Sequence, residues 1–367
     1  MAEKAIRLGG ESTADAIVSA VDAMYTEHTF AEKDFALKHN EDEIAVDTNF
    51  AAQNFWKEAL IRFFNKKSAV LGLVLIVVIV LLAVLGPGMN SYTYSGQDLS
   101  QKNFAPRVPG IEQFGILDGS EKMSTTTGTK VTNAYQEKDK PDVYYWFGSD
   151  LYGRDIWTRT WEGARVSLII AVAAAIIDML IGMSYGLISG YFGGRVDMVM
   201  QRFLEVANGI PRLVIVTLLL LVLQPGMVTI IFALMLTEWV GMSRIARAEM
   251  LKLKDQEFVL ASRTLGAGSF FIIFKEVLPN IIGPIITQVM FSIPTAIFTE
   301  AFLSFVGLGI PVPQCSLGSL ISELYNSFTT HPYQIIPPMV VMSLLMMSFN
   351  LVADGLREAL DPKMKSM

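Results

Sequence analysis

The stretch that decides the fold is Ala69–Gly86, AVLGLVLIVVIVLLAVLG, which contains no charged and no strongly polar residue. As an α-helix it rises about 27 Å, which approaches the ~30 Å thickness of the hydrocarbon core of a bilayer. It lacks the small-residue cleavage site that would mark a secretory signal. The stretch therefore predicts a transmembrane helix.

Other apolar stretches follow along the chain. They are Val166–Ile188, Ile210–Leu223 with an extension back through Phe203, Met227–Val240, Ile281–Thr299 and Ile335–Ala353. Pro225-Gly226 predicts a tight turn between two of them. The sequence therefore predicts an all-α polytopic membrane protein with about six transmembrane helices.

The composition of the 367 residues agrees with a membrane protein. Apolar residues make up 52% and charged residues 17%, whereas soluble domains carry about 25% charge. Three His and one Cys exclude a disulfide framework and a Cys/His metal site, so we expect no metal. The net charge of −6 argues against nucleic-acid binding. Residues 1–65, with 12 acidic and 6 basic residues, account for all of it.

Basic residues in short loops predict the orientation. Lys57, Arg62, Lys66 and Lys67 precede the first span, the loop 244–275 contains six basic residues, and 301–334 contains none. Both termini are therefore expected in the cytoplasm. The stretch between the first two spans is then an extracytoplasmic insertion, although it contains basic residues, because long loops translocate largely regardless of charge.

Two amphipathic segments precede the first span. Residues 14–25 have helical apolar spacing inside the acidic tail, which fits a solvated extension or a docking site for a partner. Trp56, Leu60, Phe63 and Phe64 form one apolar face beside basic residues, which is typical of a helix lying in the membrane interface. We expect this interfacial elbow helix at residues 50–67.

The most informative loop is Phe258–Pro284, FVLASRTLGAGSFFIIFKEVLPNIIGP. We expect a helix over Glu249–Leu265, a break at the glycines of 266–268, a second helix over Ser269–Val277, and Pro279 at the start of the next span. We expect the apolar side chains of this loop to face solvent: Leu265, Phe270, Phe271 and Ile273. They require either a partner surface or self-packing against the bundle.

This loop resembles the EAA-type coupling loop of ABC importer permeases, whose pattern is Glu-Ala-Ala, three residues, Gly and a later Leu-Pro. Ala261, Gly266 and Leu278-Pro279 match the pattern, while Leu260 and Ser262 replace its Glu and its second Ala. By this resemblance the residues that contact an ATPase would be Ala261, Ser262, Arg263, Leu265, Gly266, Ala267, Phe270 and Pro279.

Further motifs narrow the resemblance to permeases of the oligopeptide and dipeptide (OppC/DppC) type, over about residues 50–367. They are Phe147–Asp150, Gly153, Arg154, Asp155, Arg159, Gly190–Gly194, Glu300–Gly309 and Asp354–Pro362. Glu205 stands where that family usually has Asp. The acidic tail and the stretch 87–147 lie outside the resemblance.

The resemblance implies a non-catalytic subunit in the plasma membrane that forms the translocation pathway as a heterodimer with a second permease. Two cytoplasmic ATPase subunits and an extracytoplasmic peptide-binding protein would complete the importer. The chain has no G-x-x-x-x-G-K-[ST] phosphate loop, so ATP and Mg would bind to the partner ATPases and this chain would bind no cofactor. Peptides are the expected substrate, oligopeptides before dipeptides, and a nickel chelate or glutathione is the alternative.

These considerations divide the chain into consecutive parts. The expected parts are an acidic cytoplasmic tail 1–49, the elbow helix 50–67, the first span 68–86, the extracytoplasmic insertion 87–162, a permease core 163–354 that includes the coupling loop 244–280, and a cytoplasmic tail 355–367.

Three acidic residues fall in or near the spans, namely Asp178, Glu238 and Glu300. An ionisable group in a bilayer is costly unless it is paired or hydrated. We therefore expect each to line the translocation cavity, to act in gating, or to join helices by a polar contact. A secondary transporter and a membrane scaffold without transport activity are the alternative functions. The broken-helix repeats expected of many secondary transporters are not evident in this sequence. A scaffold function would leave the loop and the three acidic residues unexplained.

Overall fold

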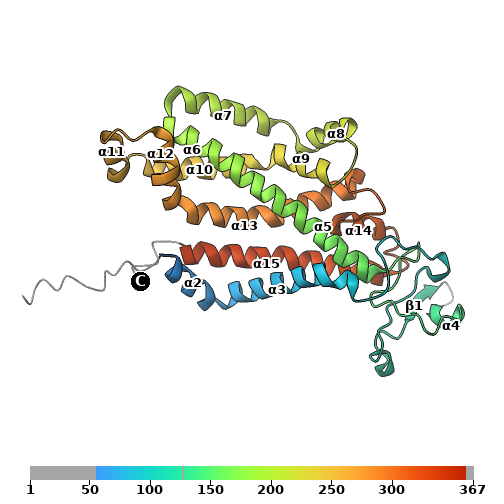
Figure 1. Ribbon diagram of the computed structural model, residues 1–367. Helices are drawn as coiled ribbons and strands as arrows, with labels where there is room; N and C mark the ends of the chain where they lie inside the picture. Colours follow the sequence, from blue (N-terminus) through green and yellow to red (C-terminus); the bar gives the residue numbers. More distant parts are fainter. Residues whose placement is uncertain (1–54, 126–127, 361–367) are drawn as a thin grey trace, which may run out of the picture. The chain divides into compact units, whose positions relative to one another are not determined.

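The computed structural model describes residues 55–125 and 128–360, in which long helices form a bundle with a small polar insertion at one end (Figure 1). The amphipathic segment predicted at residues 14–25 and the rest of the tail 1–49 lie outside the described residues, as do residues 361–367. The elements before the second span are α2 (Phe55–Asn65), α3 (Lys67–Leu85), β1 (Ser120–Thr125), β2 (Gly128–Asn133) and α4 (Ala134–Glu137).

The remaining elements are helical. They are α5 (Ile156–Ile177), α6 (Met183–Phe192), α7 (Gly194–Gly209), α8 (Arg212–Val222), α9 (Met227–Thr237), α10 (Trp239–Leu253), α11 (Glu257–Thr264), α12 (Ser269–Phe271), α13 (Leu278–Leu303), α14 (Leu317–Tyr325) and α15 (Ile336–Leu360). Within the described residues five helices are long and apolar enough to cross a bilayer, or six if the bent pair α7–α8 counts as one span. The predicted all-α polytopic architecture with about six spans is confirmed.

The second span begins earlier than the sequence predicted. α5 starts at Ile156, because the carboxylate of Asp155 accepts a hydrogen bond from the backbone N–H of Thr158 at 2.8 Å and caps the helix. It continues through a π-helical segment, Asp178–Gly182, into α6. The insertion therefore ends at Asp155 and not at residue 162, and the charged side chains of the first turns hid the start of the helix.

The third span is not the continuous helix that was expected through Phe203–Leu223. α7 and α8 are bent by 79° at Ile210-Pro211. Proline has no N–H to donate, and the residue before it disfavours helical dihedrals. Ile210 is accordingly extended, with φ −85° and ψ 125°.

The helix expected over Glu249–Leu265 is broken in two. α10 ends at Leu253, and Gln256 is extended before α11 begins at Glu257. The separate helix expected over Ser269–Val277 is instead the first part of one long helix, Ser269–Leu308. Pro279 does not end it, because Pro279 follows a π-helical segment in which the usual hydrogen-bond ladder is already shifted.

The first and last helices of the bundle, α2 and α15, also differ from expectation. α15 extends to Leu360, so the last span does not end at residue 354. In the elbow helix α2, Trp56, Leu60 and Phe64 are exposed, but Phe63 is buried against α3 and α15. The predicted apolar face is therefore divided between the outside of the molecule and the bundle.

The insertion contains a hairpin that the sequence analysis did not anticipate. β1 and β2 pair antiparallel, with Ser120 opposite Asn133 and Thr125 opposite Gly128. Phe104, Tyr135 and Tyr145 form the small buried core of the insertion. The described part of the insertion is thus a folded unit and not a simple connection.

Three glycines bring α5–α6 into backbone contact with α10. Gly182, Gly186 and Gly190 recur every four residues, and a Cβ at Gly186 would lie 2.1 Å from the carbonyl oxygen of Ser243. Small residues at this spacing allow helices in membranes to approach closely. This crossing holds the second span against the helix that leads to α11.

We therefore expect Gly186→Val to destabilise the bundle by about 1–3 kcal/mol, because the added methyl groups meet backbone that cannot move aside. Gly241→Val is the matched control, since a Cβ at that helical position has nothing within 4 Å. Thermal unfolding of the detergent-solubilised chain measures both. Equal melting temperatures for the two variants would contradict this account of the crossing.

Candidate functional site

The turn after α11 is closed by backbone hydrogen bonds. The N–H groups of Gly266 and Ala267 donate to the carbonyls of Arg263 and Ser262, both at 3.0 Å. Gly266 has φ +84°, in the left-handed region that glycine adopts without strain. Gly268, with φ −70°, then starts the next helix. Glycine is thus required by backbone conformation at residue 266 and not at residue 268.

Three apolar side chains project from this turn. Leu265 is 87% exposed, Phe270 64% and Phe271 46%. We call these three the apolar knob. The prediction that Ile273 belongs to this exposed surface is wrong, because Ile273 is fully buried. It lies on the opposite face of the helix, against the bundle.

A buried apolar cluster and a cation–π contact fix the turn that bears the apolar knob to the bundle. Val259 of α11 packs with Ile272, Ile273 and Val277 in a buried cluster that includes residues of α6 and α10. The guanidinium of Arg263 lies 4.9 Å from the centre of the Tyr191 ring of α6. The knob is therefore a rigid projection of the bundle.

The other residues expected in this loop lie in the same turn or close to it. Ala261, Gly266 and Pro279 are exposed, and Ser262 and Ala267 are partly buried. The structure thus brings the predicted loop residues together on one end of the bundle, where α11 and α12 lie (Figure 1). Their contact with an ATPase stays a prediction.

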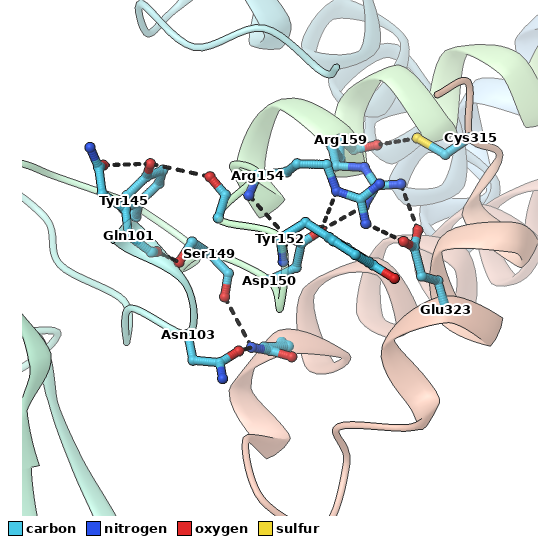
Figure 2. Close-up of polar contacts among 12 residues, drawn as sticks. Gln101, Asn103, Tyr145, Ser149, Asp150, Tyr152, Arg154, Arg159, Cys315 and Glu323 are labelled. Carbon is cyan, nitrogen blue, oxygen red and sulfur yellow. Dashed lines mark hydrogen bonds and ion pairs between the residues drawn. The ribbon is translucent and has the colours of Figure 1, made fainter. Parts of the chain in front are cut away.

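A buried network of charges (Figure 2) lies at the opposite end of the bundle, where α14 is found (Figure 1). The carboxylate of Asp150 accepts hydrogen bonds from Arg154 Nε at 2.7 Å and from Arg159 Nη1 at 2.8 Å. Glu323 of α14 accepts from Arg159 Nη2 at 2.7 Å and also from Arg154. Two guanidinium groups are thus neutralised by two carboxylates, of which only Glu323 is appreciably exposed.

The motif before the second span builds this network. The other oxygen of Asp150 accepts hydrogen bonds from the backbone N–H groups of Tyr152 and Arg154. Gly153 has φ +72°, and a Cβ there would lie 1.8 Å from the carbonyl oxygen of Asp98, so the tight turn admits only glycine. Asp155 caps α5. The four predicted motif residues, Asp150, Gly153, Arg154 and Asp155, therefore share one structural unit.

Sequence reasoning missed Glu323, which completes the network. The available signal was that residues 301–334 contain an acidic residue and no basic one. Burial raises the pKa of the Glu323 carboxyl, but the charge of Arg159 and the hydrogen bonds from both arginines outweigh burial, so its pKa lies below the ordinary value of 4.5. Cys315 is buried beside Arg159, and burial raises the pKa of its thiol.

The three acids of the spans lie apart from this network. Glu300 is 1% exposed and accepts hydrogen bonds from three serine hydroxyls, Ser316 at 2.5 Å, Ser304 at 2.7 Å and Ser167 at 3.3 Å. These serines belong to different helical segments. Glu300 therefore joins helices through polar contacts.

Asp178 is likewise buried, with Ser292 of α13 donating to it. Glu238 is partly buried at the α9–α10 junction, 3.5 Å from the Thr299 hydroxyl. A cavity of about 240 Å³ lies at the α7–α8 bend, and none of the three acids lines it. Their role in a translocation cavity or in gating stays a prediction. No cluster of His, Cys, Asp or Glu suited to a metal ion occurs in the described part of the chain.

Comparison with known families gives two matches. Residues 182–366 match the binding-protein-dependent transport system inner membrane component, and residues 54–106 match the N-terminal TM domain of oligopeptide transport permease C. Together they include the first span, the spans after the π-helical segment, and the turn that bears the apolar knob.

Curated relatives match most of the chain. The oligopeptide transport system permease protein OppC of Bacillus subtilis is 41% identical, over 85% of this chain and 91% of that protein. The dipeptide transport system permease protein DppC of the same organism is 38% identical, over 90% and 93%. Among solved structures, an inward-facing MetNI methionine ABC transporter is similar at 15% identity with a TM-score of 0.47, over 54% of this chain and 94% of that one.

The buried network generates a prediction on stability. Asp150→Asn leaves Arg154 and Arg159 to share one carboxylate, and we expect a loss of about 3 kcal/mol in unfolding free energy. The control is Glu205→Gln, which breaks the exposed ion pair with Arg202 and should cost about 0–1 kcal/mol. Thermal unfolding of both variants measures the difference, and equal losses would contradict the network's contribution.

The lowered pKa of Glu323 generates a prediction on pH. A carboxyl whose pKa is lower in the folded chain stabilises it above the unfolded pKa of about 4.5 and loses that contribution as the pH falls through the folded value. As the pH is lowered from 4.5, we expect the melting temperature of the unchanged chain to decrease more than that of Glu323→Gln, which lacks the titrating carboxyl. Identical pH profiles would contradict the assignment.

Proposed function

The chain belongs to the family of inner-membrane components of binding-protein-dependent transport systems, and we propose that it is the permease subunit of an ATP-driven importer of peptides. The observation that carries the proposal is the apolar knob. Large apolar side chains on a rigid projection, at the end of a membrane bundle, form a surface suited to a protein partner. We propose that this partner is an ATPase subunit, as the resemblance of the loop to a coupling loop implies.

The connection between the apolar knob and the membrane supports this function. Phe270 and Phe271 lie at the start of the continuous helix Ser269–Leu308, so displacement of the knob is carried into a span without an intervening loop. Closure of an ATPase dimer on ATP would move the knob as a rigid body. The spans would then switch between two arrangements, each favoured by a different ligand state.

The chemistry of ATP hydrolysis is assigned to the partners. Because the chain has no phosphate-binding loop, ATP and Mg would bind to two ATPase subunits, and this chain would contribute positioning alone. The basic loops beside α2 and α11 favour a cytoplasmic location for the knob and for both termini. A second permease would complete the pathway as a heterodimer, and an external binding protein would deliver the peptide.

Peptides are the proposed substrates because both the oligopeptide and the dipeptide permeases named above match over most of their length. The match of residues 54–106 to an oligopeptide permease domain favours oligopeptides. A nickel chelate or glutathione remains the alternative substrate. A secondary transporter is the alternative class, and purification of a stable, active transporter without any ATPase would support it.

The turn provides the direct test. We expect Gly266→Val to uncouple ATP hydrolysis from peptide uptake, because valine at φ +84° is strained by about 1–2 kcal/mol and displaces the apolar knob. Gly268→Val is the matched control, since residue 268 has an ordinary extended backbone and open space around its Cβ.

The measurement is uptake of a labelled tetrapeptide and ATP hydrolysis by the reconstituted complex, with an unlabelled dipeptide as competitor. Coupled uptake by the Gly266→Val variant, at the level of the control, would refute the proposed role of the turn. Preferential competition by the dipeptide would refute the preference for oligopeptides.

A further inference from the structure

A second exposed apolar surface lies in the insertion, far from the apolar knob in the fold. It consists of Ile111, Phe114, Ile116 and Leu117, which are 42%, 80%, 61% and 43% exposed. We call this segment, residues 108–117, the insertion tip. Its one charged residue, Glu112, is paired with Arg107. The insertion tip is therefore an apolar surface with no free charge.

The insertion tip is held in shape by its base. The N–H of Val108 donates to the carbonyl of Leu117 at 3.1 Å, and the backbones of Arg107 and Asp118 form an isolated antiparallel β-bridge. The Arg107 guanidinium also lies 4.4 Å from the centre of the Tyr144 ring. Because both ends are fastened, the apolar side chains are presented by a closed loop.

The backbone of the insertion tip is in the left-handed region at three positions. Gly110 and Gly115 have positive φ, and so does Leu117, at +52°. The left-handed region is unfavourable for leucine, and such strain persists only where the surrounding structure fixes it. A large apolar side chain thus occupies a position that glycine would fill with less strain, and it faces outward.

The location of the insertion tip indicates what it contacts. In Figure 1 the loop, in teal, projects beyond the end of α3 and away from the other helices. The outer face of α3 consists of exposed large side chains such as Val74, Leu81 and Val84, while Ala69, Gly72 and Ala83 are buried. Helix interfaces in membranes favour small residues, so the outer face of α3 meets lipid.

Aromatic residues mark the bilayer surface at the same place. Trp157 donates its indole N–H to the carbonyl of Gly86, at the end of α3, and packs against Trp146. Tryptophan prefers the membrane–water interface. The end of α3, beyond which the insertion tip projects, therefore lies at the bilayer surface.

We propose that the insertion tip inserts its apolar side chains into the adjacent leaflet of the membrane and anchors the insertion to the lipid surface. The absence of free charge in the tip matches the acyl–headgroup boundary and not an anionic headgroup. The proposal requires that the chain spans a membrane and is independent of what it transports. It stands or falls separately from the proposed import function.

Site-directed spin labelling tests the proposal on the full chain in lipid nanodiscs. The one cysteine, Cys315, is buried, so a nitroxide attaches selectively to Phe114→Cys. Val131→Cys is the matched control, because Val131 is 60% exposed on β2 of the same insertion. Ile116→Cys provides a second reporter in the tip.

We expect labels at 114 and 116 to collide several-fold more often with dissolved oxygen than with a water-soluble nickel chelate, and the label at 131 to show the reverse. Equal access of the chelate to all three labels would overturn the proposal. So would protection of positions 114 and 116 that arises only when a peptide-binding protein is added, since that result assigns the surface to a protein partner.

Discussion

The hydrocarbon core of a bilayer offers no hydrogen-bond partner, and every part of the bundle is arranged around that constraint. In the described bundle the backbone departs from the regular α-helix at the Ile210-Pro211 bend and in π-helical segments such as Asp178–Gly182. Buried acids in the spans have hydroxyl partners, as Glu300 has from three serines. The buried charges of Asp150, Arg154 and Arg159 lie together at one end of the bundle and form ion pairs with one another.

One helix links the two ends of the bundle. Ser269–Leu308 begins at the apolar knob and passes Ser292, which bonds Asp178, before it reaches Glu300. Glu300 is bonded to Ser316, the capping residue of α14, and α14 carries Glu323 into the charge network. Side-chain contacts thus run from the turn along this helix to the charge network at the far end of the bundle.

The spans that are long and uniformly apolar could be predicted from the sequence, because a continuous apolar stretch of sufficient length is recognised without knowledge of tertiary contacts. Prediction from the sequence failed where tertiary contacts decide. The start of α5 was missed because Arg159 is charged in sequence yet neutralised by Asp150 and Glu323 in the fold. Ile273 was assigned to the exposed surface because periodicity alone could not tell which face of the helix the bundle covers. The predicted motif residues before α5 did come together, while their partner Glu323 lies in a segment distant in sequence.

The proposed import mechanism requires that the apolar knob contacts an ATPase subunit. A photo-cross-linking amino acid at Leu265, which is 87% exposed, tests this contact in washed membranes from cells that express the complete transporter. Leu221, which is 78% exposed on α8, is the control position. The account predicts an adduct between residue 265 and a nucleotide-binding subunit, with yield that changes on ATP addition, and no such adduct from residue 221. An adduct to that subunit from both positions, or from neither, would contradict it.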